Sequence, residues 1–291
     1  MKTMDFEAFA DQIRAQGWRV HGAEAYERQH LCGSFGDTAS LFPIYSATKT
    51  VLSVAVGIAA DEGRFDLGRS VLDYLDGKTL AGLSGQQREA FAPLTLHRLM
   101  TMSVEGFPFR PEGEDYLRFS LTCPLPDPGT PSFHYSNIPA YLTGVALTNA
   151  LGEDAAEWIG RRLMEPLGIA EWSYDRCPSG YFYGASGMKL SVNSLSRIGL
   201  LLMQGGDWHG ERIVSEAYVK KATSALQMNR EGGYGYFIWK YRDGFSINGK
   251  WKQKCYILPA QGLVITYLSD IRDDSHDLLR SREKHLLGIP E

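Results

Sequence analysis

A serine followed three residues later by a lysine is the feature of this sequence with the clearest chemical potential. On a helix the two side chains lie on one face, so a neutral lysine amine could take the serine proton and create a nucleophile. The spacing occurs three times, as Ser46/Lys49, Ser186/Lys189 and Ser281/Lys284. Because so short a pattern arises readily by chance, the residues around each pair must indicate which of the three could be catalytic.

Only Ser46 and Lys49 stand at the start of a long apolar segment, which runs to Ala60. Backbone N–H groups at a helix start favour developing negative charge, and burial lowers the pKa of a lysine because it disfavours the charged amine. Lys189 follows glycines in a loop-like stretch, and Lys284 stands in a strongly charged, solvated segment. Ser46 is therefore the predicted nucleophile and Lys49 its base. The residues alone leave open that Ser46 merely caps the helix while Lys49 reaches solvent.

Composition disfavours several other classes of function. The 291 residues are 44% hydrophobic and 22% charged, with a net charge of −4, which is typical of a globular protein and attracts neither nucleic acid nor anionic lipid. The longest apolar segment is too short to span a bilayer, and acidic residues near the N-terminus argue against a secretory signal. Four widely spaced cysteines without histidine partners fit reduced thiols. We expect a cytoplasmic protein without metal or cofactor, whose oligomeric state the sequence does not indicate.

A nucleotide site at residues 244–250 is also disfavoured, although these residues match the GxxxxGK pattern. Trp251 stands where a Mg²⁺-binding Ser or Thr belongs. A strand-like segment follows where a phosphate-binding helix should begin.

Periodicity and stop signals predict a mixture of helices and strands. Helices are predicted over 5–16, from 46 to 60, over 95–102, over 139–150, from 154 to before Pro166, over 195–203, near 215 and over 272–287. Strands are predicted within 18–35 and over 234–241, 254–258 and 263–268. This order predicts an α+β fold, with an antiparallel sheet built from both ends of the chain and flanked by terminal helices. We expect residues 1–60 and 206–291 to form the sheet domain and 61–205 an inserted helical region of one catalytic unit.

Longer stretches resemble a known family. The segment LFPIYSATKTVLSVAVGIAADEGRFDL (41–67) closely resembles the first motif of the serine β-lactamase-like hydrolases, which include class C β-lactamases, penicillin-binding DD-peptidases and related esterases. The resemblance continues in TLHRLMTM (95–102), in Tyr135-Ser136-Asn137 as the YxN motif, in residues 185–215 and in GYGYFIWK (233–240). It covers most of the chain in the order of the family, and implies the β-lactamase/transpeptidase-like fold.

The resemblance implies roles for individual residues. Ser46 would be the nucleophile and Lys49 its base partner, Tyr135 would pass the proton to the leaving group, and Asn137 would orient the substrate and Lys49. A purely structural alternative is that Tyr135 and Asn137 belong to a capped turn before the helix predicted over 139–150.

The third family motif, a Lys or His, any residue and a Gly, is less well matched. Counting back from Pro259 gives Lys250-Trp251-Lys252, followed by Gln253. Lys252 would replace the glycine and narrow the cleft for bulky substrates, and the Gln253 N–H would share an oxyanion hole with that of Ser46. Alternatively, these lysines only protect a solvated edge strand.

The predicted function is a serine hydrolase that forms an acyl-enzyme with a small ester or amide. Two alternatives remain: β-lactamase or DD-peptidase activity at the same residues, and a catalytically silent protein that binds a ligand because Lys252 blocks turnover.

Overall fold

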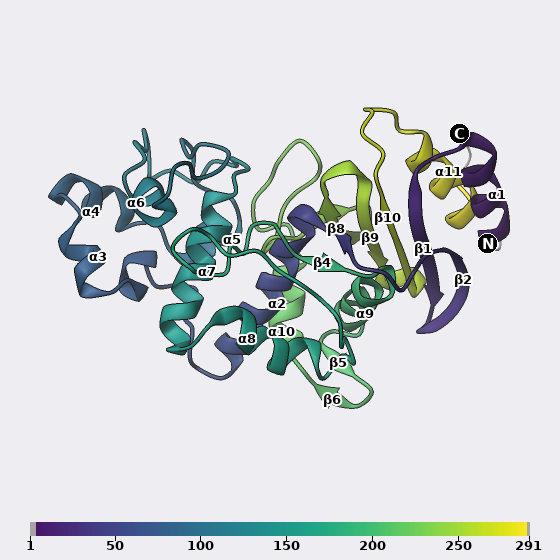
Figure 1. Cartoon of the computed structure of the whole chain (residues 1–291), viewed down its shortest axis with the longest axis horizontal. Coiled ribbons are helices and arrows are strands. Elements are labelled where there is room, and N and C mark those ends of the chain that lie inside the picture. The colour runs from purple at the N-terminus through teal and green to yellow at the C-terminus, as the bar shows by residue number, and fades with distance from the viewer. Residues whose placement is uncertain (1–3, 290–291) are drawn as a thin grey trace.

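The protein is described by a computed structural model that covers residues 4–289. Its centre is a six-stranded antiparallel sheet in the order β2-β1-β10-β9-β8-β7 (Figure 1). The strands come from both ends of the chain: β1 (Val20–Glu27), β2 (His30–Gly36), β7 (Trp239–Tyr241), β8 (Gly244–Gly249), β9 (Gln253–Leu258) and β10 (Leu263–Ser269). The predicted α+β class and the antiparallel sheet are confirmed.

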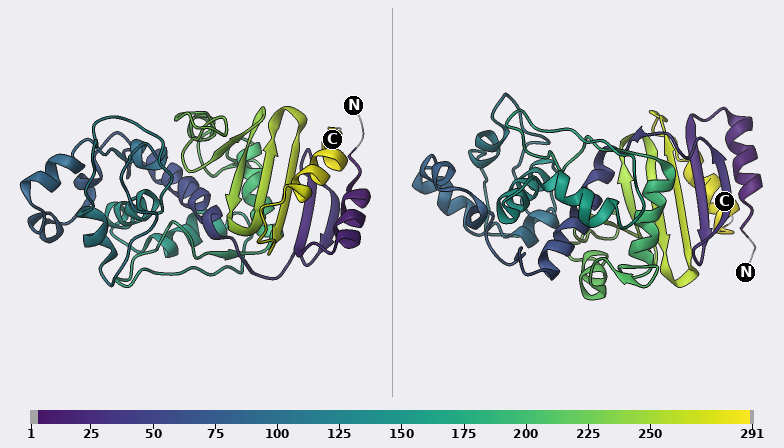
Figure 2. Two further views of the ribbon diagram at one scale, coloured as in Figure 1. Left: turned by 90° about the horizontal axis from the view of Figure 1, so that it is seen from above. Right: turned by 60° about the horizontal axis from the view of Figure 1, so that its bottom comes forward.

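Helices cover both faces of the sheet (Figure 2). The terminal helices α1 (Phe6–Gln16) and α11 (Asp277–Leu286) pack together over β1, β10 and part of β9, which is called the outer face below. Helix α9 (Val192–Met203) covers the inner face, and it approaches closely because Gly199 has no side chain: a Cβ there would lie 2.5 Å from Cys255 Sγ. The boundary expected at residue 205 places α9 with the helical region, whereas in the structure this helix packs on the sheet.

The residues that lie in the sequence between β2 and β7 form a mostly helical region, seen on the left of Figure 1. Its helices are α3 (Gly77–Ala81), α4 (Gly85–Phe91), α5 (Leu96–Met100), α6 (Tyr116–Leu121), α7 (Ile138–Leu151) and α8 (Ala155–Ile159), with α10 (Glu216–Ala222) following α9. The predicted N-caps are present, because Thr95 accepts from Arg98 N and Asp154 from the first turn of α8. Helix α2 (Thr48–Asp61) runs between this region and the sheet and is buried over nearly its whole length.

Three predicted elements differ from the structure. The strand expected over 234–241 begins only at Trp239. Phe237 has a φ of +56°, which interrupts the extended backbone, and the backbone at Gly235 packs so tightly that a Cβ there would lie 1.9 Å from Ala222 O. Helix α11 begins at Asp277 rather than 272. Residues 250–252 form a turn and not a strand, with Trp251 and Lys252 at φ of +58° and +65°.

Candidate active site

Ser46 lies on a tight turn that leads directly into the buried helix α2. The turn, Tyr45–Ala47, is a short 3₁₀ helix, and Ile44 N donates to Met188 O at its start. Tyr45 has a φ of +48°, a left-handed conformation that costs a non-glycine residue about 1 kcal/mol. This turn leaves the Ser46 side chain partly exposed at the end of an otherwise buried helix.

Lys49 lies one turn further on and is only 1% exposed. Its Nζ donates to Ser46 Oγ at 3.2 Å, Asn137 Oδ1 at 2.7 Å and Ala185 O at 2.7 Å. Burial lowers the pKa of Lys49 to about 7, because charging a desolvated amine is costly and no neighbouring charge among the described residues offsets that cost. A Lys49 amine that is substantially neutral at pH 7 is chemically able to accept a proton from Ser46.

Tyr135 and Asn137 converge on the same amine from a segment almost ninety residues away. The Lys49 Nζ lies 5.1 Å from the centre of the Tyr135 ring. Burial raises the pKa of Tyr135 to about 12, while a hydrogen bond with Ser46 lowers it. The phenol is therefore protonated at neutral pH and can act as a hydrogen-bond donor. Asn137, next to helix α7, presents its Oδ1 to Lys49 rather than merely capping the helix.

The other two Ser/Lys pairs lie in different surroundings. Lys189 is exposed on the short strand β4 (Lys189–Leu190), which pairs with β3 (Phe42–Pro43). Lys284 is exposed, as expected for this charged segment, but the segment is not solvated throughout: Ser281 is 2% exposed within α11 and donates to Gln12 Oε1 at 2.7 Å. Its hydroxyl is held by a glutamine in the terminal-helix core, far from the helix-start environment of Ser46.

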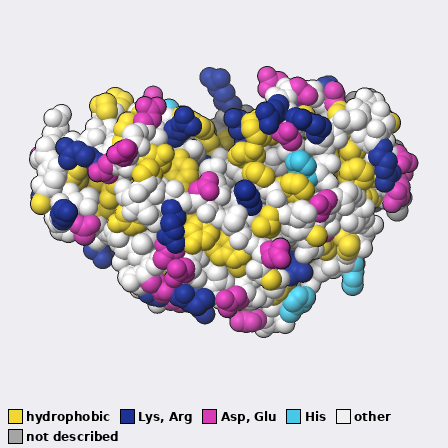
Figure 3. All heavy atoms as spheres, in the orientation of Figure 1, with side chains coloured by type: hydrophobic (Ala, Val, Ile, Leu, Met, Phe, Trp, Pro, Cys, Tyr) yellow, Lys and Arg dark blue, Asp and Glu magenta, His cyan; other side chains and the backbone are white. Residues whose placement is uncertain are grey.

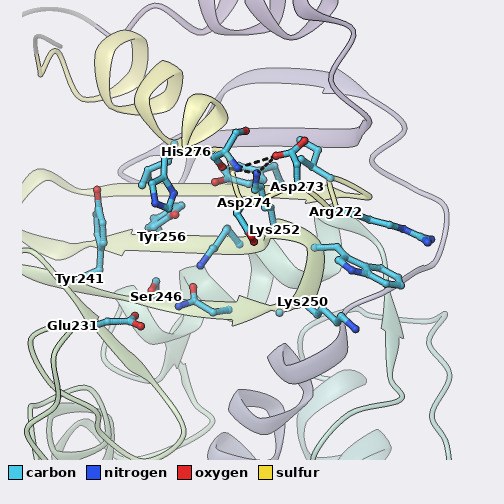
Figure 4. Close-up of a pocket in the computed structure, with 18 of the residues that line it drawn as sticks. Glu231, Tyr241, Ser246, Lys250, Lys252, Tyr256, Arg272, Asp273, Asp274 and His276 are labelled. Carbon is cyan, nitrogen blue, oxygen red and sulfur yellow. Dashed lines mark hydrogen bonds and ion pairs between the residues drawn. The ribbon is translucent and has the colours of Figure 1, made fainter. Parts of the chain in front are cut away.

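The turn at 250–252 approaches the Ser46 turn through Trp251, but Lys252 is directed elsewhere. The Trp251 ring packs edge-on against Tyr45 with 4.9 Å between centroids. Lys252 Nζ donates to Ser275 O at 2.6 Å and forms an ion pair with Asp273 at 3.1 Å, on the loop before α11 (Figure 4). The Lys252 side chain is therefore directed away from the Ser46 turn and does not narrow the cleft beside it.

Gln253 is also turned away from the cleft and is 2% exposed. Its Nε2 donates to Ser269 O at 2.6 Å and to Lys250 O at 3.1 Å, while its Oε1 accepts from Ser269 N at 2.9 Å. The side chain therefore ties the 250–252 turn to strand β10. Lys250 is exposed, and its amine lies 4.8 Å from the centre of the Trp251 ring.

The close backbone approach that the third motif requires occurs at Gly249. A Cβ on Gly249 would lie 2.2 Å from Ile44 O, directly before the Ser46 turn. Strand β8 ends at this glycine, and β9 lies behind β8 in the sheet order. Gly249 directly precedes the predicted triplet Lys250-Trp251-Lys252, so the closest backbone contact with the Ser46 turn falls at the edge of that triplet.

An aromatic wall beside Ser46 was not anticipated from the sequence. Tyr135 stacks on Trp239 at 5.5 Å, and both rings contact the fully buried Tyr234, while Phe133 packs on Tyr234 and Trp239. The GYGYFIWK stretch contained the relevant signal, but its alternating aromatics resemble a strand. The wall gives the site an apolar side suited to the carbon skeleton of a substrate.

The direction of the Lys252 side chain leads us to predict that this residue does not affect the preference between esters and β-lactams. Lys252→Gly is expected to leave unchanged, within about twofold, the ratio of kcat/KM for a short-chain aryl ester to that for a cephalosporin. The reason is that the removed side chain contacts Asp273 and Ser275 and not the Ser46 cleft. Steady-state kinetics on both substrates checks this, and a tenfold shift toward the cephalosporin would show that Lys252 does restrict the cleft.

No group of three or more His, Cys, Asp or Glu side chains within residues 4–289 is arranged to hold a metal ion. Over the same range, no helix combines the length and the apolar character needed to cross a membrane.

The sequence matches the family model described as Beta-lactamase over residues 23–287. The chain therefore belongs to the beta-lactamase family, as the motifs around Ser46 and Tyr135 predict. A related protein is the 6-aminohexanoate-dimer hydrolase of Paenarthrobacter ureafaciens, 24% identical over 230 residues that cover 70% of this chain. This chain spans only 56% of the length of that relative.

Solved structures show the same fold. A provisionally named 6-aminohexanoate-dimer hydrolase from Bacillus anthracis superposes with a TM-score of 0.78 at 18% identity, covering 96% of this chain and 83% of its own. A provisionally named beta-lactamase from Bacteroides dorei gives 0.77 at 15% identity, covering 98% and 100%. A penicillin-binding protein from Bacillus halodurans gives 0.73 at 15% identity, covering 94% and 99%. At these identities the likeness establishes the fold.

Proposed function

We propose that this protein is a serine hydrolase that forms an acyl-enzyme on Ser46 with a small linear amide or ester. The observation that carries the proposal is the environment of Lys49: a buried amine, without a carboxylate partner among the described residues, 3.2 Å from the Ser46 hydroxyl. A protein maintains such a costly group most readily where a base is needed. The curated relative named as a hydrolase of an amide dimer supports the substrate class.

In the proposed reaction the neutral Lys49 amine takes the Ser46 proton while Oγ attacks the substrate carbonyl carbon. The protonated Lys49 is held by Asn137 Oδ1 and Ala185 O, which accept its remaining hydrogen bonds at 2.7 Å each. The Tyr135 phenol, protonated because burial raises its pKa to about 12, donates its proton to the leaving amine or alkoxide and is reprotonated by the Lys49 ammonium, which holds the proton taken from Ser46. Water then hydrolyses the acyl-enzyme by the reverse use of the same groups.

The negative charge that develops on the carbonyl oxygen needs hydrogen-bond donors nearby. We assign this role to the backbone N–H groups of Ser46 and Lys250, because β8 passes the Ser46 turn at Gly249 and Lys250 is the next residue. Gln253 N, the donor expected from the family resemblance, is the alternative, because Gln253 pairs with Gly249 and β9 also contacts the Ser46 turn. Lys250 would act here through its backbone, and its side chain remains exposed.

Hydrolysis of β-lactams at the same residues is the second candidate, since the family and several similar structures carry that name. The aromatic wall offers an apolar surface along which a slim linear substrate can lie, and the relative named 6-aminohexanoate-dimer hydrolase supports such a substrate. We therefore favour the linear amide or ester.

Covalent labelling tests the proposal directly. A fluorophosphonate probe is expected to modify Ser46 and to leave Ser186 and Ser281 unmodified, because only Ser46 has a buried lysine amine within hydrogen-bonding distance. Peptide mass spectrometry locates the label, and Ser46→Ala serves as the unlabelled control. Absence of any label on folded protein would favour the silent, ligand-binding alternative, and label on another serine would refute the assignment of the nucleophile.

A further inference from the structure

The outer face of the sheet carries a large cleft that is separate from the Ser46 site. The terminal helices cover β1, β10 and the Tyr256 end of β9 but leave β8 open, and a cleft of about 830 Å³ lies beside them. Ser246, Asn248 and Lys254 are among its lining residues. In Figure 4 the loop that carries Asp273, Asp274 and His276 lies above Ser246 and forms the upper rim. We refer to it as the outer cleft. None of Ser46, Lys49 and Tyr135 lines it.

The outer cleft is positively charged although the protein carries a net charge of −4. Six basic side chains line it against three acidic ones: Lys240, Arg242, Lys250, Lys252, Lys254 and Arg272 against Glu231, Asp273 and Asp274. Lys and Arg side chains gather in the same region on the upper edge of the molecule, above the ends of β8 to β10 (Figure 3). Such a concentration of one sign of charge in a concave site attracts counter-ions.

Lys254 is the cation in this cleft that most needs a partner. It stands on β9 opposite Asn248 of β8 and beside Tyr267 of β10. Burial lowers its pKa to about 8, and no hydrogen bond or ion pair of its amine is found among residues 4–289. Glu231, on the facing loop, raises the pKa from beyond ion-pair distance, whereas the charge of Arg282 lowers it. A poorly solvated amine in this position gains free energy when an anion binds.

The neighbouring charges do not supply that anion. Arg282 is fully buried against the ring of Tyr256 at 3.8 Å, and its Nε and Nη1 have no hydrogen-bond partner. Its nearest carboxylate, Glu283 at 3.5 Å, is already bound by Arg242 at 2.8 Å. On the rim, Asp273 is bound by Lys252, and Asp274 is exposed. The floor of the outer cleft therefore has an excess of positive charge.

Asn248 adds an uncharged polar group at the same point. Its Oδ1 is buried without a hydrogen-bond partner, directly across the β8–β9 pairing from Lys254. Buried polar atoms are rarely left unpaired. A carboxamide and an amine side by side can together hold an oxyanion that also carries a hydroxyl.

We propose that the outer cleft is a binding site for a compact oxyanion, a phosphoryl or carboxylate group of a small molecule, with Lys254 as its main contact. Asn248 Oδ1 accepts a hydrogen bond from the hydroxyl of a ligand that carries one, and His276 and the ion-paired Lys252 lie on the rim. The site shares only its Gly249–Trp251 edge with the segment that passes Ser46. It is thus a second site, whose main contact, Lys254, is not among the residues that we assign to the hydrolase reaction.

Titration calorimetry of the full chain with two probes tests this proposal. Inorganic phosphate represents a phosphoryl group with a hydroxyl that can donate to Asn248 Oδ1, and succinate represents carboxylates. Each is titrated at pH 7.5 against sodium chloride of equal ionic strength. We expect saturable binding of at least one probe, with Lys254→Gln weakening it at least tenfold and Lys254→Arg retaining it. The probe that binds more tightly identifies the class of group. Lys78→Gln, an exposed lysine on α3, is the matched control and should bind as the wild type does.

Chemical footprinting of the unmodified protein keeps the test independent of how the variants fold. Amine acetylation at Lys254, read by peptide mass spectrometry, should fall severalfold when the bound probe is present, whereas acetylation at Lys78 should not change. Equal heats for the probes and sodium chloride, or equal affinity in wild type and Lys254→Gln, would overturn the proposal. Labelling of Ser46 by a fluorophosphonate is a separate readout, so failure of one proposal is distinguishable from failure of the other.

Discussion

Lys49→Arg is expected to lower kcat/KM for amide or ester hydrolysis by about 10⁴-fold. Two properties of the site produce this effect. The Lys49 amine is substantially neutral near pH 7 because burial lowers its pKa to about 7, whereas a guanidinium remains charged at every accessible pH. In addition, the pocket is fitted to one nitrogen, which Ser46, Asn137 and Ala185 surround at 2.7 to 3.2 Å.

The wild-type pH profile supplies the measurement that separates loss of the base from loss of structure. Because only the neutral Lys49 amine accepts a proton, kcat/KM of the wild type should be low in acid and rise through an apparent pKa near 7. That value belongs to the coupled group of Lys49, Tyr135 and Ser46 rather than to one residue. In Lys49→Arg this rise should be absent from the residual activity.

Lys189→Arg is the matched control, since Lys189 belongs to another Ser/Lys pair but is exposed on β4. We expect this variant to retain wild-type rate and pH dependence. Far-UV circular dichroism and a thermal melt establish that both variants are folded. A folded Lys49→Arg protein with more than a tenth of wild-type activity would show that another group is the base.

Gly249→Ala is expected to lower kcat/KM about 100-fold and to destabilise the fold by about 1–3 kcal/mol. The added Cβ would lie 2.2 Å from Ile44 O, and it would also meet Gln253 Cβ at 2.9 Å. Since both neighbours belong to packed segments, β8 must shift away from the turn that carries Ser46. A displacement of this kind separates the proposed Lys250 N–H from the oxyanion that it should stabilise.

Activity assays and urea unfolding of Gly249→Ala measure the two effects. Gly85→Ala is the control, because a Cβ on Gly85 at the start of α4 meets no atom within 4 Å. Its activity and free energy of unfolding should remain close to those of the wild type. Full activity in Gly249→Ala would show that the close approach of β8 to the Ser46 turn does not shape the site.

The relation between Ser46 and Lys49 could be predicted from the sequence because it is local. Three residues on a helical segment place the two side chains on one face, and the apolar run to Ala60 indicates burial of that helix. The same local logic predicted the caps at Thr95 and Asp154. The α+β class followed from the order of helical and strand-like segments, which the structure confirms.

The partners of Lys49 could not be derived from spacing. Asn137 and Ala185 lie 88 and 136 residues further along the chain, and for Asn137 only the family resemblance indicated a role. Ala185 contributes a backbone carbonyl, which is present at every position and therefore has no signature in the sequence. The aromatic wall had the alternating pattern of a strand, but the positive φ of Phe237 and the tight packing of Gly235 prevent one.

The third motif shows most clearly where tertiary structure decides. Counting from Pro259 assumed a continuous strand through Lys250-Trp251-Lys252, whereas these residues form a turn with two left-handed positions. The sequence alone determines which residues can react and which helix presents them, because those relations are set by a few covalent bonds. Which glycine touches the Ser46 turn depends on the packing of β8 against residues about two hundred positions earlier, and the direction of Lys252 depends on the loop before α11. Only the folded chain brings those surfaces together.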